Sequence, residues 1–212
     1  MTKKQKTENN KQIKLYTKTG DGGESGLGSG QRLPKSDPVF EVLGTIDELN
    51  SWLGVCVVQA KKITNHKLQI TNKSKTSNSK FETKQTVQEL QRVQEMLLKC
   101  GASVGANKDF KKEIEQEVTW LEGRIDHYQS QFGDDWFKRF LLPGGTELAA
   151  RIDVARSVCR RAERIFVSDS RQPTADSNKS IGQYLNRLSD YLFALRCWVN
   201  EQAGYDEQEF ES

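Results

Sequence analysis

The chain has 212 residues and a formal net charge of +3, a length that favours one domain with added segments over two complete domains. No apolar run approaches the roughly 20 residues that cross a bilayer, and none follows the lysine-rich start, so we expect neither a membrane span nor a secretory leader. The four cysteines stand in separate hydrophobic segments, which predicts reduced core thiols, no metal site and a cytoplasmic protein.

The charges are concentrated outside the predicted core. Residues 1–14 hold five lysines and one glutamate, residues 61–86 hold seven lysines and one glutamate, and residues 201–212 hold five acids. A nucleic-acid-binding protein needs a basic face on the fold itself, so this distribution argues against a nucleic-acid partner. We divide the chain into a disordered basic tail (1–14), a glycine-rich segment (15–44), a helical domain (45–203) and an acidic tail (204–212).

The glycine-rich segment is the first candidate site. Residues 17–30 contain six glycines and four hydroxyl side chains, with Lys18 among them. Glycine lets backbone N–H groups converge on an anion, and hydroxyls and lysine add donors for phosphate oxygens. The spacing matches neither a P-loop nor a dinucleotide-binding fingerprint. The composition fits both a polyphosphate cradle and a flexible linker.

Apolar residues at helical spacing predict five helices and almost no strand. The first runs from Thr45, as N-cap of a capping box with Glu48, to about Ala60. The second ends near Gly105, and seams of apolar residues place the other three at 114–132, 148–166 and 181–199. This pattern predicts an all-α, five-helix up-and-down bundle.

An insertion separates the first two predicted helices. Residues 61–86 contain only four clearly apolar side chains among Lys, Thr, Ser and Asn. Burial of so few apolar groups does not offset the entropy of ordering the chain, so we expect this segment to be disordered.

The fourth predicted helix carries a stripe of charge. Arg156, Arg160 and Arg164 share one face with Glu163 beside them. A guanidinium suits phosphate oxygens, and an anionic ligand would relieve the repulsion within the cluster. The same pattern also fits a solvated face on which Glu163 is the internal partner.

Two further features adjoin this stripe. Asn186 lies on the fifth predicted helix, where an amide can hold a base or ribose or simply face solvent. The loop 140–146 introduces the fourth helix, with Thr146 as its N-cap and two glycines that allow close approach of a ligand. Phe140 alone reads as a core residue.

Three ordered blocks resemble one family. Residues 17–50 contain TKTGDGG, Lys35 and GTIDELN; residues 140–164 contain FLLPGGT and RSVCRRAER; residues 184–193 read YLNRLSDYLF. The chain resembles the PduO-type ATP:cob(I)alamin adenosyltransferases over most of residues 14–202 apart from the insertion. The resemblance implies a five-helix bundle of the ferritin-like or cobalamin adenosyltransferase-like kind, assembled as a homotrimer with active sites between subunits.

The resemblance also implies roles for individual residues. ATP contacts in the amino-terminal segment would be Thr17, Lys18, Thr19, Gly20, Asp21, Gly23, Ser25, Gly26 and Lys35. The helical ATP contacts would be Arg160, Arg161, Glu163, Arg164 and Asn186, with Arg160 also catalytic. Asp47 and Arg156 match a pair that joins neighbouring subunits. Phe140 matches the aromatic residue at the lower face of the corrinoid. A phenyl ring in that position offers cobalt no lone pair, so the cobalt stays four-coordinate and is easier to reduce.

The implied reaction transfers the 5′-deoxyadenosyl group of ATP to cob(I)alamin, with Mg²⁺ assisting and a flavin-dependent reductase converting cob(II)alamin to cob(I)alamin. The product would serve an adenosylcobalamin-dependent enzyme. One alternative is a carrier that binds adenosylcobalamin and delivers it without catalysis. Another is a helical oligomerisation module whose arginines only form interfaces. Turnover and ATP binding distinguish the three.

Overall fold

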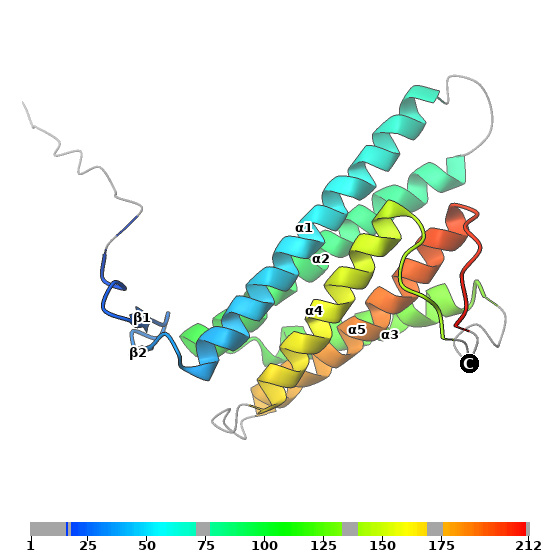
Figure 1. Cartoon of the computed structure of the whole chain (residues 1–212). Coiled ribbons are helices and arrows are strands. Elements are labelled where there is room, and N and C mark those ends of the chain that lie inside the picture. The colour runs from blue at the N-terminus through cyan, green and yellow to red at the C-terminus, as the bar shows by residue number, and fades with distance from the viewer. Residues whose placement is uncertain (1–15, 17, 71–76, 133–139, 169–175, 211–212) are drawn as a thin grey trace, which may run out of the picture.

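The computed structural model describes residues 16, 18–70, 77–132, 140–168 and 176–210. Five helices make up most of this part of the chain (Figure 1): α1 Pro38–Ile70, α2 Ser77–Ala106, α3 Lys111–Gln129, α4 Glu147–Ser168 and α5 Asp176–Gln202. The predicted mostly helical fold of five helices is confirmed. No helix within the described ranges is both long enough and apolar enough to cross a membrane.

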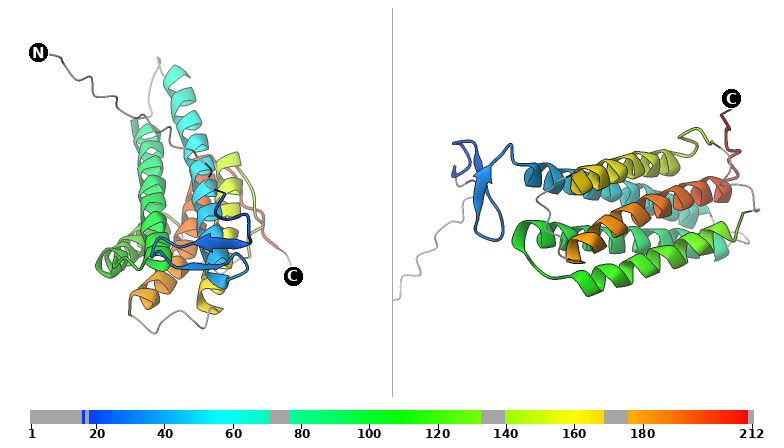
Figure 2. Two further views of the ribbon diagram at one scale, coloured as in Figure 1. Left: turned by 90° about the vertical axis from the view of Figure 1, so that its left-hand side faces the viewer. Right: turned by 90° about the horizontal axis from the view of Figure 1, so that it is seen from below.

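A short hairpin precedes the helices, and the sequence analysis did not predict it. Strands β1 (Glu24–Gly26) and β2 (Arg32–Pro34) are antiparallel, with Ser25 opposite Leu33. Figure 2 shows this hairpin at one end of the helical body. The backbone N–H of Ser29 donates to the carbonyl oxygen of Gly105 over 3.1 Å, which attaches the hairpin to the end of α2.

The start of α1 differs from the prediction. Asp37 accepts a hydrogen bond from the N–H of Val39 over 3.0 Å and is followed by Pro38, the arrangement of an N-cap with proline in the first turn. Thr45 lies inside the helix, where its hydroxyl donates to the carbonyl oxygen of Glu41 over 2.7 Å. The predicted cap at Thr45 is therefore wrong, and residues 38–44 belong to α1 rather than to the glycine-rich segment.

The predicted disorder over 61–86 is also wrong for most of that segment. Helix α1 continues to Ile70 and α2 begins at Ser77, while residues 71–76 lie outside the described part of the chain. Ile63 packs against the core and Val87 is buried. Adding residues to an existing helix costs far less than nucleating one, which explains helix in a polar segment. The far ends of α1 and α2 project beyond the other three helices (Figure 1).

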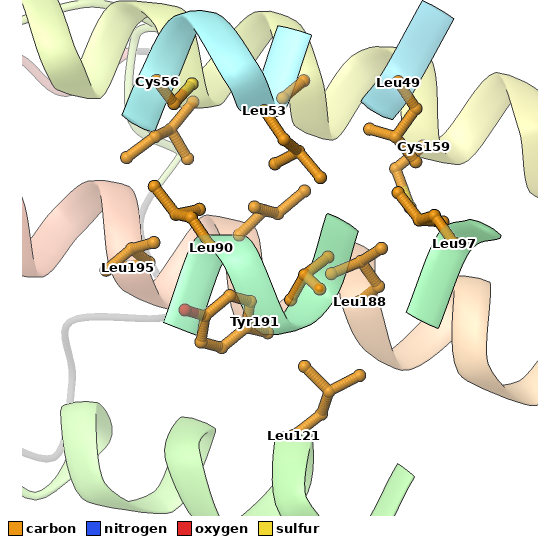
Figure 3. Close-up of a cluster of buried hydrophobic side chains, with 14 of the residues drawn as sticks. Leu49, Leu53, Cys56, Leu90, Leu97, Leu121, Cys159, Leu188, Tyr191 and Leu195 are labelled. Atoms are coloured by element: carbon orange, nitrogen blue, oxygen red, sulfur yellow. The ribbon is translucent and has the colours of Figure 1, made fainter. Parts of the chain in front are cut away.

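The core runs along the helices as predicted from the apolar spacing. Helix α1 packs on α2 and α4, and α5 packs on α4 and α3. Leucines from four helices meet with Tyr191 in the centre (Figure 3). All four cysteines are free and buried. The basic tail 1–14 lies outside the described residues.

Candidate functional site

The polar face between α4 and α5 is the first component of the site. Asn186 of α5 donates from Nδ2 to Oε1 of Glu163 on α4 over 2.8 Å. Two turns towards the start of α4, the guanidinium carbon of Arg156 lies 6.0 Å from the centre of the Phe193 ring. These two contacts join the helices along the stripe that the sequence predicted, so α5 supplies the partner side of the arginine face.

The arginines of α4 have different surroundings. The Arg160 guanidinium is exposed and has no side-chain partner among the described residues. Arg164 donates to the carbonyl oxygen of Arg160 over 3.2 Å. Arg156 donates weakly to Oδ1 of Asp153 over 3.5 Å, and Arg161 pairs with Glu48 of α1. The Arg160 side chain is thus the one placed to accept an anionic ligand without breaking an existing pair.

A groove between α1 and α4 divides the predicted stripe. It has a volume of about 590 Å³ and is lined by side chains that include Trp52, Arg161 and Arg164. Arg164 therefore lies at this groove, whereas Arg156 and Arg160 do not line it. The prediction that the three arginines share one face is too simple. Asp47 lies exposed on α1, where no described residue pairs with it.

Charges at the polar face also act on the core below it. Burial raises the pKa of the Cys159 thiol, Glu163 raises it further, and Arg160 opposes this effect. The thiol donates to the carbonyl oxygen of Leu185 over 3.2 Å. Cys159 is therefore a protonated packing residue and not a nucleophile.

The glycine-rich segment brings several predicted ATP contacts together. Lys35 lies over Gly20, whose missing Cβ would be 3.5 Å from the lysine Nζ, and Arg32 donates to the carbonyl oxygen of Thr19 over 2.7 Å. Lys18 has a positive φ of 60°, and Gly23 has φ 85°. Ser25 and Gly26 lie in β1, Asp21 precedes it in the turn, and Thr17 is outside the described residues.

The hairpin and the carboxyl-terminal end of α4 lie towards the same end of the helical body (Figure 1), because α4 runs antiparallel to α1. Within the described residues, neither strand packs against α4. A Cβ on Gly28 would lie 2.8 Å from the Ala106 Cβ, so the hairpin instead approaches α2 closely. The structure does not join the hairpin to the arginines within one chain.

The Phe140 loop (140–146) lies towards the other end of α4. The Phe140 side chain is 82% exposed, so its interpretation as core is wrong. Thr146 caps α4 as predicted, since its Oγ1 accepts from the N–H of Ala149 over 3.3 Å. Leu141 forms a backbone bridge with Glu209 of the carboxyl-terminal segment.

The residues that hold this loop were missed by the sequence analysis. Arg196 is 1% exposed and bonds to Asp153, Glu207 and two loop carbonyls, and Asn200 bonds to the backbone of Thr146. The available signal was a lone arginine within the apolar run 192–199, because a charge on a core face requires partners.

Comparison with known proteins gives a consistent result. The family model described as "Cobalamin adenosyltransferase" matches residues 15–199. The corrinoid adenosyltransferase of Bacillus subtilis is 37% identical over 202 residues, covering 94% of this chain and 93% of its own. Human corrinoid adenosyltransferase MMAB is 34% identical over 203 residues, covering 92% of this chain and 72% of its own.

A solved structure also matches. It is a phenylalanine-to-histidine variant of a PduO-type ATP:corrinoid adenosyltransferase from Lactobacillus reuteri, complexed with cobalamin and ATP. The TM-score is 0.76 at 32% identity, over 94% of this chain and 97% of that one. An arginine-to-lysine variant complexed with ATP gives 0.74 at 32% identity, over 93% of this chain and 100% of that one.

Proposed function

The chain belongs to the cobalamin adenosyltransferase family, and we propose that its α4–α5 polar face and its glycine-rich hairpin together hold ATP. The chain is an ATP:cob(I)alamin adenosyltransferase. Cobalt(I) donates an electron pair that forms the bond to the ribose C5′, the bond from C5′ to the triphosphate oxygen breaks, and triphosphate leaves with the electron pair of that broken C–O bond. The protein supplies no covalent nucleophile, so its tasks are alignment and stabilisation of charge.

The exposed Arg160 guanidinium, which no described side chain neutralises, is the observation that carries this assignment. Negative charge accumulates on the departing triphosphate, and an oriented guanidinium stabilises it most in the transition state. Asn186 and Glu163 are fixed to each other beside it and are suited to the sugar or base. The remaining ATP contacts are Lys18, Thr19, Gly20, Asp21, Gly23, Ser25, Gly26, Lys35, Arg161, Arg164 and, outside the described residues, Thr17.

The site is completed by a second subunit of a homotrimer of up-and-down bundles. Two observations support this: neither hairpin strand packs against α4 in one chain, and Asp47 has no described partner. Arg156 makes only a 3.5 Å bond to Asp153, which leaves donors for another carboxylate. Asp47 of one subunit and Arg156 of the next therefore form the intersubunit pair.

Phe140 forms the lower face of the corrinoid site, because its ring is exposed on a fixed loop and offers cobalt no lone pair. Among the described residues, no three His, Cys or acidic side chains come together as a metal site. Mg²⁺ would arrive with ATP and be held chiefly by phosphate oxygens, a common mode for this ion.

The reaction also needs partners. A flavin-dependent reductase in the cytoplasm supplies the electron that converts cob(II)alamin to cob(I)alamin, and an adenosylcobalamin-dependent enzyme receives the product. The need for an electron donor follows from the oxidation states of cobalt, whereas the flavin of the reductase and the enzyme that receives the product are what the family resemblance implies.

The deciding experiment mixes purified protein with ATP, Mg²⁺ and chemically reduced cobalamin and follows the cobalt–carbon product by its absorption spectrum. Product formation above a protein-free control supports the enzyme. Corrinoid binding without turnover supports the carrier instead. Absence of thermal stabilisation by ATP leaves only the oligomerisation module.

A further inference from the structure

Arg196 is a charged residue inside the hydrophobic body of α5. Its side chain is 1% exposed, and Leu195 and Trp198 beside it are buried. A guanidinium is retained in such a position only where other groups replace its hydration. Arg196 therefore has partners whose arrangement indicates what the charge does.

Two carboxylates from different parts of the chain neutralise it. Nε donates to Oδ2 of Asp153 on α4 over 3.1 Å, and Nη1 forms an ion pair with Oε1 of Glu207 in the carboxyl-terminal segment at 2.8 Å. Asp153 is itself 6% exposed. One buried cation thus joins α5, α4 and the chain after α5.

The Nη2 donor of Arg196 holds the backbone of the Phe140 loop. Nη2 of Arg196 donates to the carbonyl oxygen of Leu142 over 3.0 Å and to that of Gly144 over 3.4 Å. Oδ2 of Asp153 accepts from the N–H of Gly144 over 3.0 Å. The Arg196–Asp153 ion pair therefore binds the N–H of Gly144 and the carbonyl oxygens of Leu142 and Gly144.

Asn200, one turn further along α5, repeats this pattern. Its Oδ1 accepts from the N–H of Thr146 over 2.9 Å, and its Nδ2 donates to the carbonyl oxygen of Gly144 over 3.1 Å and to Oε1 of Glu207 over 3.0 Å. Gly145 has φ 96°, and a Cβ there would lie 2.3 Å from Asn200 Nδ2, so only glycine fits.

The carboxyl-terminal segment closes over the other side of the loop. The N–H of Phe210 donates to the carbonyl oxygen of Phe140 over 2.7 Å, and the N–H of Leu142 donates to that of Gln208 over 2.8 Å. Glu207 ties this segment back to Arg196. The backbone next to Phe140 is therefore fixed from two sides while its ring stays exposed.

We propose that Arg196 is a positioning residue for Phe140: it clamps the Phe140 loop between α4, α5 and residues 205–210 and so sets where the ring meets the corrinoid. This inference rests on the proposed function. Arg196 does not touch substrate. Misplacement of a reacting group by about 1 Å can cost about 100-fold in rate, so a clamp on an exposed ring has a measurable effect.

The test compares Arg196→Lys with wild type in two assays. Lysine keeps the buried charge but cannot make the forked contacts, so the variant is expected to fold where a neutral one would leave two carboxylates uncompensated. We expect at least a 10-fold loss of turnover when cob(II)alamin must be reduced on the enzyme. We expect less than a 3-fold loss when cob(I)alamin is supplied, with KM for ATP unchanged.

Arg124→Lys is the matched control. Arg124 is another largely buried arginine, paired with Glu89 over 2.8 Å and stacked on the Tyr128 ring at 4.7 Å, away from the loop. It should leave the ratio of the two rates unaltered. In a Phe140→Ala background, Arg196→Lys should add no further loss, because the two residues act through one ring. Equal losses in both assays, or additive losses in the double variant, overturn the inference.

Hydrogen exchange gives a readout independent of turnover. Backbone amides of 140–146 and 205–210 should exchange at least 10-fold faster in Arg196→Lys than in wild type or Arg124→Lys. Unchanged exchange overturns the clamp while the proposed function stands. A wild-type protein that makes no adenosylcobalamin overturns the proposed function and the catalytic part of the inference with it.

Discussion

Asn186 and Glu163 form a hydrogen bond of 2.8 Å that crosses from α5 to α4. The amide donates to one carboxylate oxygen, so the amide oxygen of Asn186 faces away from Glu163 and remains available to a ligand. This hydrogen bond holds both side chains in one orientation before substrate arrives. The side chains therefore lose less conformational entropy when substrate binds.

Replacement of Asn186 by alanine should therefore weaken ATP binding. We expect KM for ATP to rise about 10-fold with kcat at saturating ATP little changed, because the lost contact serves substrate and transition state alike. Steady-state kinetics at varied ATP measure this effect. Gln183→Ala, at an exposed position of α5, is the control. An unaltered KM would remove Asn186 from the ATP site.

Arg160→Ala should act differently, because we assign this guanidinium to the departing triphosphate. Loss of one oriented donor costs about 2–4 kcal/mol of transition-state stabilisation, so we expect kcat to fall about 30- to 1000-fold. Single-turnover rates of adenosylation measure the change. Arg151→Ala on the same helix, which removes a pair with Glu147, should stay close to wild type. A similar kcat in both variants contradicts the assignment.

Phe140→Ala should slow the overall reaction far more when cob(II)alamin must be reduced on the enzyme than when cob(I)alamin is supplied. The alanine leaves space for a ligand below cobalt, and such a ligand stabilises Co(II). Parallel assays with the two cobalt states measure the ratio, and Val167→Ala, another exposed apolar position, provides the reference. Equal losses in both assays would argue against a role at the lower face.

Asp47→Asn should disturb assembly more than chemistry. Removal of one charge from the proposed intersubunit pair would leave Arg156 without its partner in the proposed trimer, which would destabilise the interface. Light scattering should show a larger fraction of smaller species at low protein concentration, whereas Glu41→Gln, elsewhere on α1, should not. A trimer of undiminished stability with wild-type kinetics would rule out this pair.

The buried thiols make stability depend on alkaline pH. Burial raises the pKa of both Cys56 and Cys100 to about 12. In the unfolded chain these thiols ionise near pH 8.5, so stabilisation is fully present below that pH and is lost as pH rises towards 12.

We expect the free energy of unfolding to fall by about 1–2 kcal/mol per thiol between pH 8 and pH 10. Urea denaturation across this range measures the slope. Cys100→Ala should reduce the slope of unfolding free energy against pH by the contribution of one thiol. The cavity left by the smaller side chain lowers stability equally at every pH and does not change this slope. Identical slopes in the variant and in wild type would contradict this account.

Much of the fold follows from apolar spacing alone. The seams of the last three helices are buried as predicted, for example Ile152 and Leu188, because burial on one face requires that spacing. The errors lie at the two ends of α1. The helix begins at the Asp37-Pro38 cap and not at Thr45. It also continues through the polar residues 61–70, because adding residues to a helix that the core has nucleated costs little.

The site was predicted unevenly, for a physical reason. Glu163 and Asn186 lie together, with Arg160 exposed on the same helix as Glu163, because all three stand on helices whose faces can be derived from spacing. The Arg196, Asp153 and Glu207 cluster joins segments far apart in the chain, and no local period relates them. Whether the β1–β2 hairpin reaches the arginines of α4 depends on packing between elements far apart in the chain. The amino-acid composition of the hairpin does not specify that packing.

The projecting ends of α1 and α2 affect how the particle moves in solution. A 33-residue helix is about 50 Å long, while α3 with 19 residues spans about 29 Å. The chain is therefore elongated and experiences more hydrodynamic drag than a sphere of equal mass. A molecular weight calculated from the elution volume of a sizing column will therefore be too high. The number of subunits must be determined by light scattering or sedimentation equilibrium.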